Sequence, residues 1–463
     1  MLLLRNALVA ATMDSARREI ANASVLIDGR RIHSVGPAAE IDAWIAQDPA
    51  HRTPMRTLDL SGCVVLPGLV NGHHHLYQTL TRTIGTSAGL ELFDWLKLLY
   101  PIWGRMNPEA VRVGTLIGLA ELVLSGATTV ADHLYLFPNG SRLDDEIDAA
   151  RAIGVRFHPT RGSMSLGESK GGLPPDNLVE DERAILADCE RVIATFHDPA
   201  PGSMLRIGLA PCSPFTVSRD LMRETATLAY AHDRVGLHTH LAEVADEERF
   251  CLAKFGQRPV DYAESLGWLN DRTWFAHVVC ISAPEISRLA RARTGVCHCP
   301  TSNMILGSGI SPVRQMMDAG VKVALGVDGS ASNDGNHMLG EARQAMLLQR
   351  VAKPAANVVS AREALELATL GGAAALGRDD IGSLEPGKCA DLVAFRVDDL
   401  EHAGSLSDPI ASLVTCAPGR AWLSVIDGRI VVESGELTDL EIGPIVETHN
   451  RISRRMLQEA GHA

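Results

Sequence analysis

Between residues 65 and 380 the chain alternates short apolar segments with helix-length stretches, and this alternation constrains its fold most. The expected strands are 63–70, 128–132, 155–158, 206–210, 234–241, 273–278, 295–298 and 321–328. Strands that alternate with helices indicate a parallel sheet, either closed as a (β/α)8 barrel or open and doubly wound. Polar residues, chiefly His and Asp, gather at the carboxyl ends of these strands. This favours the barrel, because barrels carry their functional groups on that rim.

The two ends of the chain carry the same hairpin signal. Asp28-Gly29 lies between apolar segments 25–27 and 32–35, and Asp427-Gly428 lies between segments 424–426 and 430–432. An Asp-Gly pair supplies the positive φ angles that a tight hairpin needs. We therefore predict an α/β protein in which residues 65–380 form a (β/α)8 TIM barrel. Residues 1–64 and 381–440 form a small β-sandwich domain, and residues 441–463 form a C-terminal helix.

Charge and composition exclude several classes of function. The chain has 43 Lys plus Arg against 56 Asp plus Glu, a net charge of −13, and no basic run that could neutralise phosphates. We expect no nucleic-acid partner. The nine cysteines show no paired spacing, and the N-terminus lacks the basic-then-apolar order of a signal peptide. No segment is apolar enough for a membrane span, so we expect a cytoplasmic protein without a membrane partner.

Asn71-Gly72-His73-His74-His75 follows the first expected barrel strand and has the spacing of a metal site. Side chains at i and i+2 of an extended segment share a face, so His73 and His75 can bind one ion while His74 points away. The alternative for an isolated triplet is a set of surface or hydrogen-bonded histidines.

Three further strands end in residues suited to the same chemistry. His240 precedes Glu243 by three residues at the end of the fifth strand, so the imidazole can bind a metal while the carboxylate transfers protons. His238 is a second candidate, with a core histidine bonded to backbone as its alternative. His277 and Asp328 end the sixth and eighth strands. A carboxylate in such a position also serves as a helix N-cap.

Taken together, these motifs resemble the amidohydrolase superfamily. The resemblance runs from the N-terminal hairpin through residues 71–75, 238–243, 299–304 and 327–332 to 381–392. It implies that His73, His75, His240 and Asp328 bind one divalent metal ion, that Glu243 shuttles protons, and that His277 orients the attacking water. Binuclear relatives need a bridging carbamylated Lys after the fourth strand, and residues 206–215 contain no Lys. We expect a mononuclear zinc site, with iron and manganese as alternatives.

The resemblance also implies a class of substrate. Mononuclear members of this kind are commonly aminohydrolases of purines, pyrimidines or triazines. Residues 73–79 and 158–168 favour an oxopurine, and we expect hydrolysis of 8-oxoguanine to urate and ammonia. The alternatives are a hydroxyatrazine-type triazine, guanine or another nucleobase, a cyclic amide opened by the same site, and a catalytically silent barrel. Gln78 and Arg161 are the expected substrate-binding residues, although Arg161 also suits a loop salt bridge. A homodimer is expected.

Overall fold

The computed structural model describes residues 1–47, 55–353 and 355–462, and its largest unit is a closed barrel of parallel strands. The strands follow one another in the order β10-β11-β12-β13-β6-β7-β8-β9, which excludes the open doubly wound sheet. Their bounds are β6 (Leu69–Asn71), β7 (Ala127–Leu134), β8 (Arg156–Ser163), β9 (Gly208–Pro211), β10 (Gly236–Leu241), β11 (Thr273–His277), β12 (Gly295–His298) and β13 (Lys322–Leu325).

The expected first barrel strand, 63–70, is divided between two sheets. β5 (Cys63–Pro67) pairs with the terminal strands β1 and β14, and only β6 belongs to the barrel. The break falls at Gly68, where a Cβ atom would lie 2.0 Å from Oγ1 of Thr128 on β7. A residue without a side chain is needed there because the chain passes so close to its neighbour.

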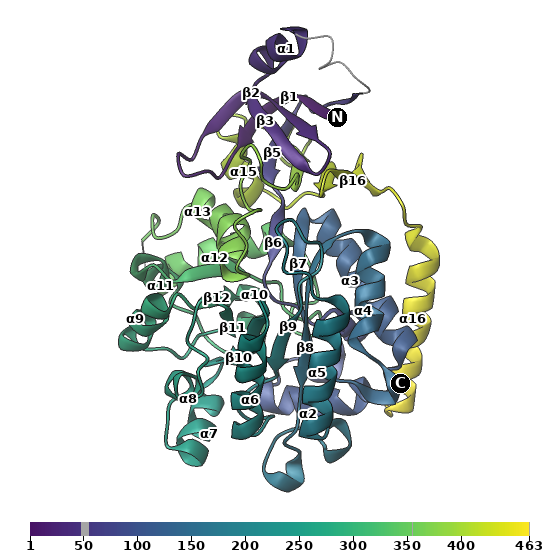
Figure 1. The fold of residues 1–463 in the computed structure, drawn as a ribbon, viewed down its shortest axis with the longest axis vertical. Helices are drawn as coiled ribbons and strands as arrows, with labels where there is room; N and C mark the ends of the chain where they lie inside the picture. The colour runs from purple at the N-terminus through teal and green to yellow at the C-terminus, as the bar shows by residue number, and fades with distance from the viewer. Residues whose placement is uncertain (48–54, 354, 463) are drawn as a thin grey trace.

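Strands from both ends of the chain make the second unit, as expected, and they form one nine-stranded sheet (Figure 1). The Asp427-Gly428 turn joins β15 to β16, with φ angles of 53° and 80°. Besides β5, the sheet contains β1 (Leu2–Ala11), β2 (Glu19–Asp28), β3 (Arg31–Pro37), β4 (Arg56–Asp59), β14 (Leu392–Arg396), β15 (Leu423–Ile426), β16 (Arg429–Glu433) and β17 (Glu436–Leu437).

Helices surround the barrel, so its strands are buried on both faces (Figure 1). Asn107 caps α3 by accepting a hydrogen bond from Ala110 N. The longer helices are α1 (Ala38–Gln47), α2 (Leu92–Trp103), α3 (Pro108–Leu124), α4 (Leu143–Ile153), α5 (Glu182–Phe196), α6 (Arg219–Ala231), α7 (Ala245–Phe255), α9 (Ala283–Ala292) and α12 (Met338–Ala352). The shorter ones are α8 (Pro259–Ser265), α10 (Pro300–Ile305), α11 (Val313–Ala319), α13 (Ala361–Glu366), α14 (Gly372–Ala375) and α15 (Pro409–Thr415).

The C-terminal helix α16 (Ile442–Glu459) lies along the barrel and contacts α3 (Figure 1). It also supports the short 3-10 helix Leu76–Thr81 that follows the histidine triplet: His449 Nε2 lies 3.1 Å from Thr79 Oγ1, and Ser453 Oγ donates to Leu80 O. None of the helices in the described ranges has the length and apolarity to cross a membrane. The expected homodimer and cytoplasmic location stay predictions.

Candidate metal centre

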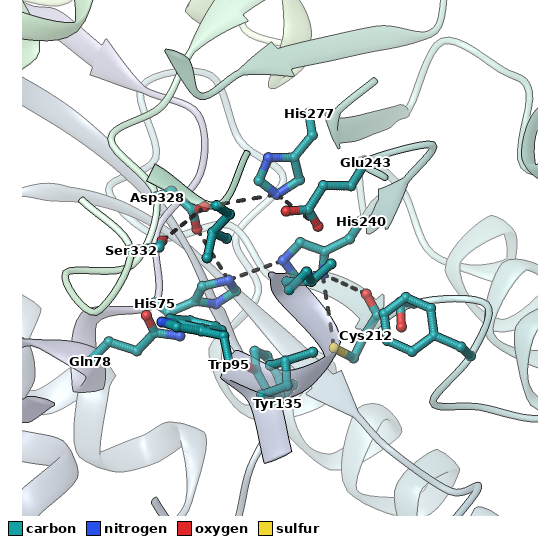
Figure 2. Close-up of a pocket in the computed structure, with 15 residues that line it drawn as sticks. His75, Gln78, Trp95, Tyr135, Cys212, His240, Glu243, His277, Asp328 and Ser332 are labelled. Atoms are coloured by element: carbon teal, nitrogen blue, oxygen red, sulfur yellow. Dashed lines mark hydrogen bonds and ion pairs between the residues drawn. The ribbon is translucent and has the colours of Figure 1, made fainter. Parts of the chain in front are cut away.

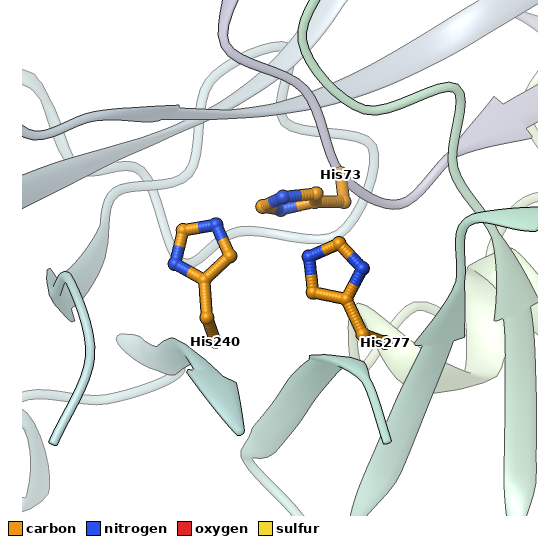
Figure 3. A group of neighbouring side chains, drawn as sticks. All are labelled: His73, His240 and His277. Atoms are coloured by element: carbon orange, nitrogen blue, oxygen red, sulfur yellow. The ribbon is translucent and has the colours of Figure 1, made fainter. Parts of the chain in front are cut away.

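The four expected ligands come from three places on the barrel rim and meet at one point. His73 and His75 follow β6, His240 lies on β10, and Asp328 follows β13. His75 Nε2 lies 3.1 Å from His240 Nε2, and Asp328 Oδ1 lies 3.2 Å from His73 Nε2 and 3.4 Å from His75 Nε2. Figure 3 shows the rings of His73, His240 and His277 turned toward one another.

The other ring nitrogens identify which atoms are free to bind an ion. His75 Nδ1 donates to His133 O at 2.7 Å, and His240 Nδ1 donates to Cys212 O at 2.6 Å. A carbonyl oxygen can only accept, so in the neutral rings the lone pairs lie on Nε2. Two lone pairs therefore face each other across the 3.1 Å between His75 and His240.

A cation bound between the two nitrogens would remove the repulsion between these lone pairs. Donors at 2.0 to 2.1 Å from a tetrahedral zinc ion lie about 3.3 Å apart, which is close to the separations seen here. His73 Nε2 is buried and has no hydrogen-bond partner within the described residues, although it faces the Asp328 carboxylate. Three imidazoles and one carboxylate thus fit a divalent ion.

Burial and the contacts among these groups together keep them in the protonation states that metal binding requires. Burial lowers the pKa of His75 to about 3, with nearby His73 as a second cause, and lowers the pKa of His240 well below its ordinary value. Burial alone would raise the pKa of Asp328, but the surrounding imidazoles hold that pKa well below its usual range. Protons therefore compete weakly with a metal ion at neutral pH.

Glu243 and His277 lie beside the ligands and close to each other. His277 Nε2 is 3.6 Å from Glu243 Oε2 and 3.8 Å from Asp328 Oδ2, while His277 Nδ1 donates to Asn303 Oδ1 at 2.9 Å. Burial raises the pKa of Glu243 to about 7, and His277 limits the rise. A carboxyl group with such a pKa can both give and take a proton near neutral pH.

Backbone geometry aims these side chains into the pocket. His277 and Asp328 have φ angles of 72° and 63°, in the left-handed region that residues other than glycine seldom occupy. The Glu247 carboxylate accepts hydrogen bonds from the backbone nitrogens of Ala242 and Glu243, at 2.8 and 2.9 Å. The segment that carries Glu243 is therefore held at two consecutive peptide groups.

The pocket above this centre has an apolar wall opposite the acid and base. Figure 2 shows Glu243 and His277 on one side and Trp95 and Tyr135 on the other. Gln78, the expected substrate contact, lines the same pocket and is 1 % exposed. The remaining lining residues are Leu92, Leu96, Cys212, Ser213, Phe215, Leu306 and Ser332.

Arg161 is not among the residues that line this pocket, so the structure does not bring it together with the other expected site residues. Its guanidinium donates to Glu180 at 2.8 and 3.0 Å and to Asp188 at 2.8 Å, and it lies 3.9 Å from the centre of the Phe137 ring. The alternative, a loop salt bridge, is what the structure contains. His238, the other candidate left open, donates from Nδ1 to Trp274 O at 2.7 Å.

Sequence reasoning missed most of the pocket wall. Phe215 and Ser332 lie in loops that follow the fourth and eighth strands, so the rule that placed the ligands could have found them. Trp95 belongs to α2, which lies within the long connection between the first two barrel strands. Nothing in the sequence around α2 indicates that it covers the rim.

The chain is similar to several known proteins in sequence and in structure. A model of the amidohydrolase family matches residues 64–431. The chain is 46 % identical over 456 residues to 8-oxoguanine deaminase of Pseudomonas aeruginosa, covering 98 % of each protein. It is 34 % identical to hydroxydechloroatrazine ethylaminohydrolase of Pseudomonas sp. strain ADP, covering 87 % of this chain and 85 % of that protein. The crystal structure of atrazine chlorohydrolase from Arthrobacter aurescens TC1 complexed with zinc has a TM-score of 0.92 and 35 % identity, covering 98 % of this chain and 100 % of that one.

Proposed function

The chain belongs to the amidohydrolase family and is a hydrolase of C–N bonds, and from this premise we propose that it deaminates the oxopurine 8-oxoguanine. Water and 8-oxoguanine would give urate and ammonia. The convergence of the His73, His75, His240 and Asp328 donor atoms beside the unligated Glu243 carries the proposal. The 46 % identity to 8-oxoguanine deaminase over nearly the whole chain supports this substrate.

The four donors would hold one divalent cation, which we propose is zinc. Its chemistry when bound is to act as a Lewis acid and to lower the pKa of water to about 7. The zinc in the related atrazine chlorohydrolase supports the choice of metal. Imidazole and carboxylate ligands also suit iron and manganese, so metal analysis of the purified protein tests the assignment.

Asp328 and His277 would act on the attacking water. Asp328 Oδ2 accepts the proton of this water, because that oxygen faces His277 while Oδ1 faces the proposed ligands. Burial opposes protonation of His277, but Glu243 and Asp328 raise its pKa above the ordinary value, so the ring can carry a proton on both nitrogens. The protonated ring would donate from Nε2 and stabilise the charge that develops as the water oxygen bonds to the ring carbon. The Asn303 bond at Nδ1 holds the ring in this orientation.

Glu243 would control the protons on the substrate. Its carboxyl group protonates the ring nitrogen next to the amine-bearing carbon, which removes the aromaticity that opposes attack. The proton taken by Asp328 then passes to the amine, the C–N bond breaks, and ammonia leaves. The proton of the added hydroxyl group returns to the Glu243 carboxylate, which gives the carbonyl of the product and restores the carboxyl group. A pKa near 7 suits Glu243 to this exchange, and a nearby cation limits how far burial raises it.

The pocket wall suits a flat heterocycle. Trp95, Tyr135 and Phe215 supply aromatic faces, and Gln78 supplies an amide that can both donate and accept. No Lys or Arg is among the lining residues in the described ranges. A hydroxy-triazine aminohydrolase is the second candidate, supported by the 34 % identical relative.

An ammonia-release panel tests the proposal directly. Purified zinc-loaded protein is given 8-oxoguanine, guanine, isocytosine and a hydroxy-triazine at equal concentrations, and urate is detected separately by chromatography. We expect 8-oxoguanine to have the highest kcat/KM. Release of ammonia or of an alkylamine from the triazine alone would support the second candidate, and ring opening without release of either would contradict both.

The assigned proton shuttle is tested with Glu243→Gln, which keeps the shape of the side chain but cannot exchange a proton. We expect kcat to fall by a factor of about 10² or more, while the metal stays bound. The exposed residue Glu224 on α6 supplies the matched control, Glu224→Gln. Near-normal turnover by folded, metal-loaded Glu243→Gln would rule out the assigned role.

A further inference from the structure

Behind the candidate ligands lies a second layer of buried histidines that the mechanism does not use. His238 is 1 % exposed, and its Nε2 lies 2.7 Å from Nδ1 of His73. His73, His133 and His238 form a group in which the possible ligand nitrogens all lie within 4.8 Å of one another. This group could hold a second metal ion or could form a hydrogen-bonded support for the first.

The hydrogen bonds distinguish these two possibilities. His238 Nδ1 lies 2.7 Å from Trp274 O, and His133 Nε2 lies 2.9 Å from Ala210 O, so both nitrogens donate. The neutral His238 ring then has its lone pair on Nε2, where it accepts the Nδ1 proton of His73. A separation of 2.7 Å is that of a hydrogen bond and is shorter than the about 3.3 Å between two ligands of one zinc ion.

This bond has a consequence for His73. With its proton held on Nδ1, the ring has its lone pair on Nε2, the atom that faces Asp328 and the candidate metal position. The other two imidazole ligands have their Nδ1 atoms held by backbone carbonyls. His73 is thus the one ligand of the three whose tautomer depends on another side chain.

Trp274 holds His238 in place and also contacts the segment that carries His73. The two rings stack with their centres 4.6 Å apart and an interplanar angle of 19°, and Trp274 Nε1 donates to Gly72 O at 3.0 Å. Gly72 directly precedes His73. Trp274 on β11 therefore holds His73 in two ways: through the ring of His238 on β10, and through the backbone of Gly72.

We propose that His238 and Trp274 form a positioning unit that fixes the tautomer and orientation of His73 and thereby sets the affinity of the metal site. The inference rests on the proposed function, since it assigns His73 as a ligand. Partners behind metal-binding histidines typically change metal affinity by 10- to 100-fold when they are removed. Neither residue lines the substrate pocket.

The test compares three variants of the full-length protein with the wild type. His238→Met removes the acceptor while filling similar space, and His238→Gln restores a side-chain acceptor. The control is His298→Met, because His298 is also a buried barrel histidine and has no hydrogen-bond partner at either nitrogen within the described part of the chain. Zinc dissociation constants come from chelator competition, and the absorption spectrum of the cobalt-substituted protein reports the ligand geometry.

We expect His238→Met to weaken zinc binding at least 10-fold and to alter the cobalt spectrum, with His238→Gln recovering most of the loss and His298→Met near the wild type. Should His238→Met not fold, Trp274→Phe supplies the second variant: it keeps an aromatic ring but loses the bond to Gly72 O, and we expect weaker zinc binding and an altered spectrum.

Three outcomes overturn the inference or its premise. Folded His238→Met that binds zinc as tightly as the wild type, with an unchanged cobalt spectrum, contradicts the positioning role alone. Two zinc ions per wild-type chain and one in His238→Met would show a second metal site instead. A wild-type chain that binds no divalent ion would overturn the proposed function itself.

Discussion

The absence of a side chain at Gly329 leaves room for the Gln78 amide beside the pocket. A Cβ atom at position 329 would lie 1.9 Å from Gln78 Oε1 and 2.4 Å from its Cδ. Gly329→Ala should therefore push the Gln78 amide away from the substrate. We expect kcat/KM for the best substrate of the panel to fall by about 10- to 100-fold, because small displacements of a positioning group have effects of this size.

The same loop provides the control for this substitution. At Gly335 the nearest atom to an added Cβ would be Asn333 Oδ1, at 3.9 Å, so Gly335→Ala should leave steady-state kinetics unchanged. The zinc content of both variants is measured as well, since Gly329 follows Asp328. Normal kcat/KM in zinc-loaded Gly329→Ala would show that the position of Gln78 does not matter for catalysis.

Individual site residues differ in how far the sequence could predict them. His73 and His75 are recognisable because an i, i+2 pair after an apolar strand projects to one side, and the structure brings both to the rim. Arg161 follows the expected strand 155–158 in the same way, although it lies within β8 of the structure, and its partners Glu180 and Asp188 lie 19 and 27 residues later. Pairing at that range is decided by the fold of a loop, which no local pattern records.

At the scale of elements, one buried ion pair joins the terminal sheet to the barrel. Arg156 on β8 is fully buried and donates to both oxygens of Asp391, which directly precedes β14, at 2.7 and 3.0 Å. Arg156→Met leaves the Asp391 carboxylate without this partner. We expect a loss of about 3 to 5 kcal/mol in the free energy of unfolding, measured by urea denaturation.

An exposed ion pair serves as the control for Arg156. Arg151 on α4 lies 3.8 Å from Asp148, and both side chains are more than half exposed, so Arg151→Met should change stability by well under about 1 kcal/mol. The double variant Arg156→Met/Asp391→Asn removes the unpaired charge and should be more stable than Arg156→Met. Equal stability of the Arg156 and Arg151 variants would refute a role for the buried pair.

A second element contact, between β7 and α4, should make stability depend on pH. Asp132 and Glu146 are both buried and their carboxyl groups interact electrostatically, and Asp132 also accepts from Leu76 N, next to His75. Burial raises the pKa of both carboxyls above their ordinary values. The folded state therefore retains a proton that the unfolded state releases, and stability falls as pH rises through the raised pKa.

Glu146→Gln tests this contact because its amide donates to Asp132 at every pH. Between about pH 6 and pH 9 the wild type should lose stability relative to the variant, with a limiting slope of about 1.4 kcal/mol per pH unit for one proton. The urea midpoint is measured across this range with zinc in excess for both proteins. Parallel curves would mean that the two carboxyls do not share a proton.

The order and approximate position of the barrel strands could be predicted because each is an apolar run bounded by polar residues. The prediction was wrong where the chain changes sheets without a change in composition, at Gly68 between β5 and β6. That break depends on Thr128, which lies 60 residues away. Long-range contact of this kind also explains why the position of α2 over the rim could not be predicted.

At the scale of the whole molecule, the candidate metal centre joins distant parts of the barrel. Its ligands come from β10 and from the segments after the adjacent strands β6 and β13, so a bound ion connects β10 to two strands with which it does not pair. A ligand that binds only the folded state stabilises it by about 2.7 kcal/mol at 100 times its dissociation constant. Removal of the metal should therefore lower thermal stability as well as abolish ammonia release.

Dialysis against a chelator, followed by differential scanning calorimetry, measures this effect. We expect a lower melting temperature for the metal-free protein and recovery of both stability and activity when zinc is returned. The variant His240→Ala lacks one ligand, so added zinc should raise its melting temperature much less than that of the wild type. If chelation abolished activity but left the melting temperature unchanged, the ion would contribute to catalysis without holding the rim together. The close approach of the His75 and His240 lone pairs argues against that result, since without a cation these nitrogens should repel each other.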